Sequence, residues 1–203
     1  MVTPLTFVGD EKALMQALAA GHPGAAAVFY DSHASHVQRT LRSVLGPDED
    51  IPDMLQEVFI RALDRITELR EVERVRAWLT SIAIFVARAH IRQRTRRRWL
   101  WQFSPERTAS KVIDQPATEV RQALREVYAL LDEMPVNERM AFVSRFIEGM
   151  TLLDGAVACS TSLATFKRRL SRSEKRFLLG AAKRPSLAHW LEDGTRWTQQ
   201  KQI

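Results

Sequence analysis

Cysteine is nearly absent from this sequence, since Cys159 is the single thiol among 203 residues. One cysteine excludes an internal disulfide and a zinc site built from cysteine ligands. No stretch approaches the roughly 18 uninterrupted apolar residues that a membrane-spanning helix needs, so we expect no membrane insertion. Residues 1–10 lack a basic segment followed by an apolar run, so we expect no secretory signal and a cytoplasmic protein.

Glycine and proline are also scarce, at eight each, which excludes a fibrous or wholly disordered chain. The chain is 45% hydrophobic and 27% charged, the balance of a protein that buries an ordinary core. Strand signals are few and helical periodicity is common. We therefore predict an all-α fold of two small helical domains joined by a linker, the C-terminal one a helix-turn-helix.

Residues 10–98 form the first predicted domain. A turn at residues 21–24 separates a short helix from a longer one that ends at Gly46-Pro47. The next helix has an acidic polar face and Asp50 as its expected N-cap. Its apolar stripe is Met54, Leu55, Val58, Phe59, Ala62, Leu63 and Ile66.

A further long helix is predicted from about Arg74 to Arg97. The spacing of its apolar residues indicates one buried face. The stripe expected there is Val75, Trp78, Leu79, Ile82, Phe85, Val86 and Ala89. Periodicity then lapses over residues 99–118, which we interpret as a linker that lies partly against protein because it carries several large apolar residues.

The second predicted domain covers residues 119–182, and residues 183–203 form a tail. Pro135 suits the first position of a helix and Gly149 suits a left-handed helix terminator. Thr151 with Asp154 resembles a capping box, and Ser162 is expected to cap the following helix. A capped helix, a tight turn and a second capped helix are the pattern of a helix-turn-helix.

Charge is unevenly spread along the chain, which has a formal net charge of +6. Residues 48–73 hold nine acidic and three basic residues, whereas residues 88–98 hold six arginines, one histidine and no acid. Such closely spaced arginines repel one another, and a phosphate backbone relieves that repulsion. We therefore expect nucleic-acid contact there, with a solvated helix end or a membrane-surface helix as the alternatives. The arginines are Arg88, Arg92, Arg94, Arg96, Arg97 and Arg98.

The second helix of the helix-turn-helix is the other candidate DNA contact. Its first turns offer polar groups to base edges and its later cations suit phosphates. An ordinary surface helix is the competing explanation. The candidate residues are Ser162, Thr165, Lys167, Arg168 and Arg172.

With both basic helices in place, residues 18–177 resemble a bacterial sigma-70-type initiation factor of the extracytoplasmic-function group. Residues 53–63, DMLQEVFIRAL, are similar to the family's D-x-x-Q-E-V-F-x-R-A-L helix. Residues 76–79, RAWL, with the arginine run after them, resemble the helix that meets the −10 promoter element. Residues 131–172 resemble the module that reads the −35 element, on the strength of Pro135, Glu138, Arg139, Gly149, Ser162, Thr165, Lys167, Arg169 and Leu170.

The resemblance implies partners and roles. Asp53, Gln56 and Glu57 become contacts to the clamp of core RNA polymerase, and the two basic helices become contacts to promoter DNA. An anti-sigma factor is expected as an inhibitory partner, because the group is commonly held inactive by one. Neither a cofactor nor a metal is expected, and the protein is not expected to be an enzyme.

Three departures from the family pattern affect these expectations. Ile84-Phe85 stands where an arginine-asparagine pair is usual, so opening of a standard −10 sequence is in question unless Phe85 simply joins the buried stripe. Gly155 stands where a large aliphatic residue is usual, and Ser160 replaces the usual turn glycine. Less core is then available in the second domain. Phe166 is expected to fill part of the gap.

Other constellations and functions carry less support. His33 and His36 lie three residues apart, but we identify no third ligand for a metal. Cys159 is interpreted as a small core side chain. A dimeric operator-binding helix-turn-helix regulator is the main alternative function, and a recombinase with a DNA-reading module is the next. The recombinase would need a strand-containing catalytic domain, which the sequence does not indicate.

Overall fold

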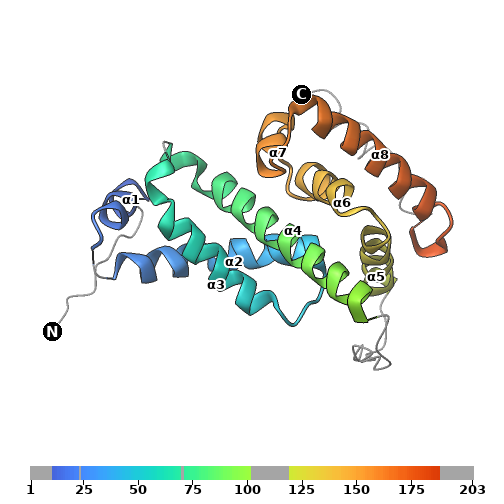
Figure 1. The fold of residues 1–203 in the computed structure, drawn as a ribbon, viewed down its shortest axis with the longest axis horizontal. Helices are drawn as coiled ribbons and strands as arrows, with labels where there is room; N and C mark the ends of the chain where they lie inside the picture. The colour runs from blue at the N-terminus through green and yellow to red at the C-terminus, as the bar shows by residue number, and fades with distance from the viewer. Residues whose placement is uncertain (1–10, 23, 70, 102–118, 188–203) are drawn as a thin grey trace.

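The computed structural model describes residues 11–22, 24–69, 71–101 and 119–187, and within these ranges it contains helices and no strand (Figure 1). The first module comprises α1 (Glu11–Ala19), α2 (Ala25–Leu45), α3 (Ile51–Asp64), the 3-10 turns η1 (Ile66–Glu68) and η2 (Val72–Arg74), and α4 (Val75–Trp101). The second module comprises α5 (Glu119–Asp132), α6 (Val136–Phe142), the π-helical turn η3 (Val143–Ile147), α7 (Leu152–Ala158) and α8 (Leu163–Ala181). The predicted all-α fold with a C-terminal helix-turn-helix is confirmed.

Glycines set both ends of α2. Gly24 precedes it at φ 84° and Gly46 follows it at φ 76°, backbone conformations that other residues rarely adopt. Asp50 is the N-cap of α3 as predicted, but its side chain makes no capping hydrogen bond. Instead Asp48 Oδ1 accepts a hydrogen bond from the Asp50 backbone N–H at 3.0 Å. Asp48 therefore orders this turn from two residues upstream.

The helix starts of the second module follow the sequence signals closely. Pro135 is the N-cap of α6 rather than its first residue, one position away from the prediction. Gly149 has φ 67°, as expected of a left-handed terminator. The Thr151 hydroxyl accepts from the Asp154 N–H at 3.1 Å, and the Ser162 hydroxyl accepts from the Thr165 N–H at 3.3 Å. Both side chains cap their helices.

The helix-turn-helix accommodates both unusual residues, Gly155 within α7 and Ser160 in the turn. A Cβ on Gly155 would lie 2.4 Å from Cζ of Phe166, so the fully buried Phe166 ring occupies the space of a larger side chain. The expectation that Phe166 fills this gap is confirmed. Ser160 takes φ 49°, the left-handed conformation that the turn requires and that glycine adopts more easily.

The α3 stripe is placed as predicted. Met54, Leu55, Val58, Phe59 and Ala62 are buried, and the stripe's last two residues pack against the same core.

The buried stripe predicted for α4 is only partly correct. Phe85 is 45% exposed and Ala89 is also exposed, whereas Ala83, Ile84 and Ala87 are buried. The prediction assumed one buried face, but α4 packs against α2 and α3 on one side and against α6 and α7 on the other. Other helices therefore cover more of the surface of α4 than one face. The buried residues lie partly on a different side of the helix from the predicted stripe.

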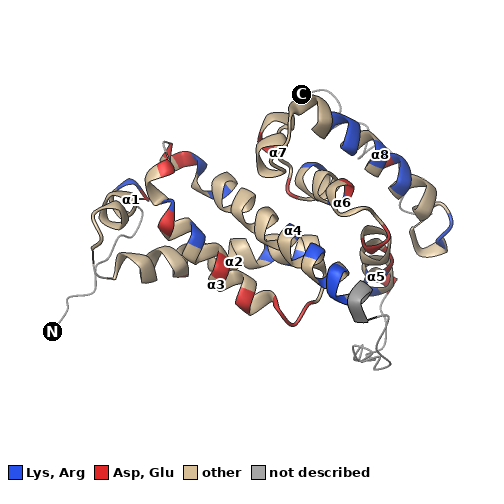
Figure 2. Ribbon diagram, in the orientation of Figure 1, with Lys and Arg blue, Asp and Glu red and all other residues tan. Residues whose placement is uncertain are grey.

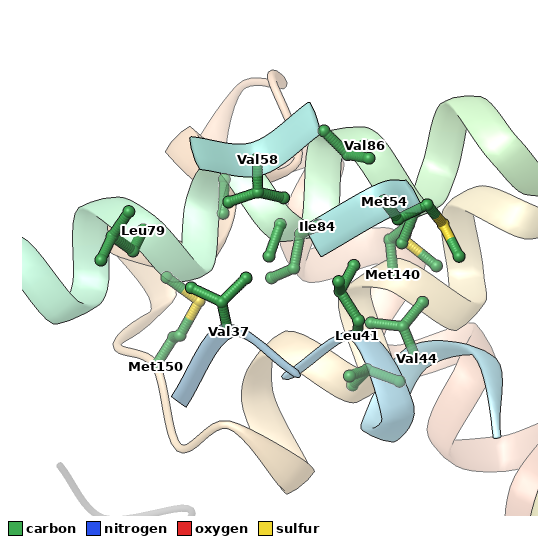
Figure 3. Packing of buried hydrophobic residues seen from close by; sticks show 14 of the residues in the cluster. Val37, Leu41, Val44, Met54, Val58, Leu79, Ile84, Val86, Met140 and Met150 are labelled. Atoms are coloured by element: carbon green, nitrogen blue, oxygen red, sulfur yellow. The ribbon is translucent and has the colours of Figure 1, made fainter. Parts of the chain in front are cut away.

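The two modules share one core. Figure 3 shows Met140 and Met150 of the second module among Val37, Leu41 and Val44 of α2. Small residues of α4 let α6 and α7 approach closely. In Figure 1 the second module accordingly lies alongside α4. None of the described helices has the length and apolar character needed to cross a membrane.

Candidate nucleic-acid interface

The outer face of α8 presents a row of cations to solvent. Phe166, Ser173 and Phe177 are buried and fix one side of the helix against the second module. Lys167, Arg168 and Arg172 consequently point away from the protein and are exposed. Figure 2 shows basic residues along this helix. A capped helix with free cations on one face suits insertion beside a phosphate backbone.

The start of α8 offers polar groups beside those cations. Ser162 is exposed and Thr165 is half-buried, and their hydroxyls lie 3.0 Å apart. Both hydroxyls are already engaged in the cap, so they stiffen the first turn as well as offering oxygen atoms to a ligand. All five candidate residues of this helix therefore lie at its N-terminal half, close to one another.

The arginine run of α4 is placed less simply. Arg96 and Arg97 are exposed, whereas the side chain of Arg98 lies outside the described residues. Arg92 is exposed but donates to the Asn137 side chain at 3.3 Å, and Arg94 donates to Asp48 at 2.9 Å. In Figure 2 the basic end of α4 lies beside α5, opposite the direction of α1. Part of the run is therefore bound to the protein itself.

Arg88 is the residue of the run that differs most from its expectation. It is half-buried between the modules and donates to the backbone carbonyl of Cys159 at 3.0 Å. Burial, reinforced by the charges of Arg92 and Arg169, lowers the pKa of the Arg88 guanidinium from its ordinary value. In this arrangement Arg88 does not face solvent as a DNA contact must.

The polar face of α3 is open. Asp53 and Gln56 are exposed, and Glu57 is partly exposed while it pairs with Arg61 at 2.6 Å. Asp53 and Glu57 border a groove between α3 and α4 whose opposite rim is Gln93, Arg94 and Arg97. A groove with carboxylates on one wall and guanidinium groups on the other can bind a protein surface of mixed charge.

Phe85 lies beside that groove rather than in the core. The Arg61 guanidinium carbon is 5.2 Å from the centre of the Phe85 ring, a cation–π distance. Ile84, its neighbour in sequence, is fully buried. Phe85 is thus an exposed aromatic residue on α4, which gives that helix a stacking surface in place of the usual polar side chain.

The histidines do not share a site. His33 is buried with Nε2 3.2 Å from Glu11 of α1, and burial together with nearby Arg76 lowers its pKa. His36 instead bonds to the Thr80 hydroxyl at 3.0 Å. The sequence did not anticipate Glu11 beside His33. Cys159 is buried as expected, and burial raises the pKa of its thiol.

One cluster of residues that could bind a metal was not predicted from the sequence. Asp48, Asp50 and His90 bring ligand atoms within 4.8 Å of one another, although His90 lies some forty residues away in sequence. His90 Nε2 is 3.5 Å from Asp50 and 3.8 Å from Asp48. Because Arg94 already pairs with Asp48, the cluster is an ion-pair network that holds the loop before α3 against α4.

Sequence reasoning also missed the polar contacts between the modules. Glu148 accepts hydrogen bonds from the hydroxyls of Thr40 and Ser43, which lie on α2. Arg139, which is buried, donates to the carbonyl of Val44 at 2.8 Å. These partners are about 100 residues apart, and the only signal was two polar residues that interrupt the apolar side of α2.

Comparison with known protein families gives two matches. The family model for Sigma-70 region 2 matches residues 29–97, and the model for Sigma-70 region 4 matches residues 124–177. The first match contains α3 and the exposed arginines of α4, and the second contains the helix-turn-helix.

Individual proteins give the same picture. The ECF RNA polymerase sigma factor SigX of Bacillus subtilis is 28% identical over 154 residues, which cover 73% of this chain and 79% of that protein. The ECF RNA polymerase sigma factor EcfG of Rhodopseudomonas palustris is 26% identical over 134 residues, covering 66% and 72%.

Two solved structures have a similar fold. The sigma factor RpoE in complex with the anti-sigma factor NepR, from Bartonella quintana, matches with a TM-score of 0.57 and 19% identity, over 76% of this chain and 94% of that one. CnrH in complex with the cytosolic domain of CnrY matches with a TM-score of 0.55 and 20% identity, over 83% and 95%. At these identities the likeness concerns the fold.

Proposed function

The chain belongs to the sigma-70 family, in its extracytoplasmic-function group, and from this membership we propose that it binds core RNA polymerase and directs it to promoters. The observation that carries the proposal is that two basic helices follow one another along the chain in the order that the family has. One follows an acidic-faced helix in the region 2 match, and the other is the second helix of a helix-turn-helix in the region 4 match.

Polymerase docking is assigned to the open polar face of α3. Asp53 and Gln56 are exposed and Glu57 borders the adjacent groove, so a polymerase surface reaches all three without rearrangement of the core. Carboxylates at this position favour a basic partner surface and repel DNA. The docking face and the DNA-facing arginines therefore lie on opposite rims of one groove.

DNA contact is assigned to both modules. On α8 we assign Ser162, Thr165 and Arg168 to base edges of the −35 element and Lys167 and Arg172 to phosphates, which their position on the accessible side of the helix supports. On α4 we assign the exposed Arg94, Arg96 and Arg97 to DNA at the −10 element, and Phe85 adds an exposed aromatic surface. Arg92 and Arg98 complete the proposed set, whereas Arg88 is left out because it is half-buried and donates to the Cys159 carbonyl.

The remaining expectations follow from this role. The protein acts by recruitment, so no catalytic step and no cofactor is proposed, and the cytoplasm is the compartment in which it meets polymerase. An anti-sigma factor is proposed as its inhibitory partner, which is supported by the similar fold of RpoE, a sigma factor solved in complex with the anti-sigma factor NepR. Free operator binding is not favoured, because the region 2 match and the acidic face have no role in it.

Run-off transcription tests the proposal directly. Purified protein is added to core polymerase on a genomic fragment library, and binding to core polymerase is measured in parallel. We expect promoter-specific transcripts with the natural sequence. The double variant Gln56→Ala, Glu57→Ala should bind core polymerase at least about tenfold more weakly, equivalent to about 1.4 kcal/mol, while remaining folded.

Asp31→Ala is the matched control, since Asp31 is an exposed acid on α2 away from the groove. It should behave as the natural sequence does. If the natural protein neither bound core polymerase nor started a specific transcript, the proposed function would be wrong.

A further inference from the structure

Two elements about forty residues apart in the chain bring three metal-ligand side chains together. Asp48 lies in the turn before α3, Asp50 is the N-cap of that helix, and His90 lies on α4. One ligand atom from each of the three lies within 4.8 Å of the other two. We expected no metal from the sequence, because a donor set of this kind has no local spacing that indicates it.

Packing one helical turn away fixes the backbone that carries two of these donors. Met54 follows Asp50 by one turn of α3, and Val86 precedes His90 by one turn of α4. Both Met54 and Val86 are buried in the core (Figure 3). Ligands held in place in this way need little further ordering when an ion binds.

The donors face one another in a largely enclosed space. The side chain of Asp48 is 6% exposed and that of His90 is 18% exposed. His90 Nε2 is closed off from solvent and has no hydrogen-bond partner among the described residues. A buried polar atom without a partner costs free energy, and ligation of a metal ion would satisfy it.

The separations suit a first-row divalent ion. Zn²⁺ holds imidazole nitrogen and carboxylate oxygen atoms at about 2.0–2.2 Å, so two ligand atoms of a tetrahedral site lie about 3.3–3.6 Å apart. His90 Nε2 is 3.5 Å from Asp50 Oδ2 and 3.8 Å from Asp48 Oδ2. Asp50 is 61% exposed, so its side chain can rotate to close the remaining gap. Three protein ligands leave the fourth position of a tetrahedron to water.

The chemistry of the donor set favours zinc over magnesium. Imidazole suits Zn²⁺ and its transition-metal neighbours, whereas Mg²⁺ prefers oxygen ligands and keeps several of its waters. A second contact orients one of the carboxylates, since Asp48 Oδ1 accepts from the Asp50 backbone N–H at 3.0 Å. Outer contacts of this kind hold a ligand in the geometry that the ion needs.

Arg94 competes with an ion for one of the ligand atoms. It donates from Nη1 to Asp48 Oδ2 at 2.9 Å, and this is the carboxylate oxygen that faces His90. The Arg94 side chain is 62% exposed, so it can move into solvent when the pair breaks. Loss of one charge-assisted hydrogen bond of this kind opposes metal binding by about fivefold.

We propose that Asp48, Asp50 and His90 bind one divalent transition-metal ion of the zinc class, with Arg94 displaced from Asp48. The ion takes the place of the ion-pair network and joins the turn before α3 to α4. The site is defined by these side chains alone and goes beyond the proposed function. It lies at one end of the groove that also holds Asp53, so the ion fixes the start of the helix assigned to polymerase docking.

Isothermal titration calorimetry with Zn²⁺ tests the site on the full chain, after treatment with a chelator that is then removed. We expect one ion to bind per chain. Asp50→Asn and His90→Gln each remove one ligand and should weaken Zn²⁺ binding at least about tenfold, because even outer-shell partners change metal affinity by that much. Asparagine suits an N-cap as well as aspartate does, so weaker binding in Asp50→Asn does not reflect a lost helix start.

Two further variants sharpen the assignment. His22→Ala is the matched control, because His22 is an exposed histidine between α1 and α2, outside the cluster. It should bind Zn²⁺ as the natural protein does. Arg94→Ala should bind Zn²⁺ about fivefold more tightly, since Asp48 Oδ2 then has no competing cation. Circular dichroism checks that every variant keeps its helices.

Thermal unfolding gives an independent readout. An ion that binds the folded chain stabilises it, so Zn²⁺ should raise the unfolding midpoint of the natural protein and of His22→Ala. The same concentration of Zn²⁺ should have little effect on Asp50→Asn and His90→Gln. Mg²⁺ at that concentration should leave all four midpoints where they are.

Several outcomes would overturn the site. These are no Zn²⁺ binding by the natural protein, full binding by both ligand variants, or loss of binding in His22→Ala. Equal binding of Mg²⁺ would also overturn it, because oxygen ligands alone would then hold the ion. Binding that does not tighten in Arg94→Ala would contradict ligation by Asp48. None of these measurements uses polymerase or DNA, so failure of the metal site leaves the proposed function standing.

Discussion

The helices α4 and α8 carry similar runs of cations but use them differently. On α8 the basic face is exposed along its length, because the opposite face is fixed by buried aromatic residues such as Phe166. On α4 the cations begin where the helix is still enclosed, so Arg88 is tied to the second module and Arg94 to Asp48. The cations of α8 are open to solvent, whereas several of those on α4 already have partners within the protein.

The difference shows that a count of basic residues in a sequence does not reveal which of them are accessible to DNA. A direct hydrogen bond to phosphate requires a guanidinium whose N–H donors are not already engaged by the protein. In α4, three of the arginines have protein partners, at Cys159, Asn137 and Asp48. Substitutions in the two helices and in the residues that hold them test this contrast.

Removal of the ring that positions α8 should have the largest effect. Phe166→Ala should lower the free energy of unfolding by about 3–5 kcal/mol, because Phe166 is fully buried and also fills the space beside Gly155. Urea unfolding measures the change. Leu153→Ala, at a position 65% exposed on α7, should alter stability by no more than about 0.5 kcal/mol. Equal losses in the two variants would contradict the assigned packing.

Truncation of an exposed α8 cation should affect DNA and spare the fold. Arg168→Ala should weaken promoter binding by the polymerase complex by about 1–3 kcal/mol if it meets a base edge. Lys12→Ala, an exposed cation on α1, serves as the control. The measurement is complex formation on a −35-containing fragment in competition with mixed-sequence DNA. Unchanged affinity would show that α8 is placed wrongly.

Loss of the α8 cap should have a smaller effect. Ser162→Ala removes the acceptor of the Thr165 N–H and should cost about 0.5–2 kcal/mol in the free energy of unfolding. Ser162→Thr or Ser162→Asp should retain most of that stability, since both keep an acceptor oxygen. A chemical denaturation series of the three variants measures this, and an equal loss in all three would mean that capping is not the role of Ser162.

Release of Arg94 from its carboxylate should have the smallest effect. Asp48→Asn keeps the shape of a side chain that is 6% exposed and keeps the oxygen that accepts from the Asp50 N–H. It removes the charge that pairs with the largely exposed Arg94, so stability should fall by about 1 kcal/mol. The same variant should bind mixed-sequence duplex slightly more tightly at low salt. Weaker binding would contradict the view that Asp48 competes with DNA for Arg94.

The sequence predicted what depends on neighbours in the chain. The caps at Thr151 and Ser162, the terminator at Gly149 and the α3 stripe all depend on residues within a few positions, and all were confirmed. The fold class and the family were predicted from the same local patterns and from their order along the chain. The roles of individual DNA and polymerase contacts stay predictions.

The features that the sequence did not predict depend on contacts between residues far apart in the chain. Phe85 was placed in the core and is exposed, because burial of α4 depends on a second module that packs from another side. The pairing of Glu148 with Thr40 and Ser43 joins residues more than 100 positions apart. The half-burial of Arg88 has the same origin. No periodicity within α4 encodes these contacts.

Hydroxyl-radical footprinting of a promoter is the sharpest test of whether both basic helices meet DNA through polymerase. We predict two blocks of protection, near −35 and near −10, that require core polymerase and include a contribution lost at −35 in Arg168→Ala. One continuous palindromic footprint by the free protein, with no requirement for polymerase, would contradict this assignment.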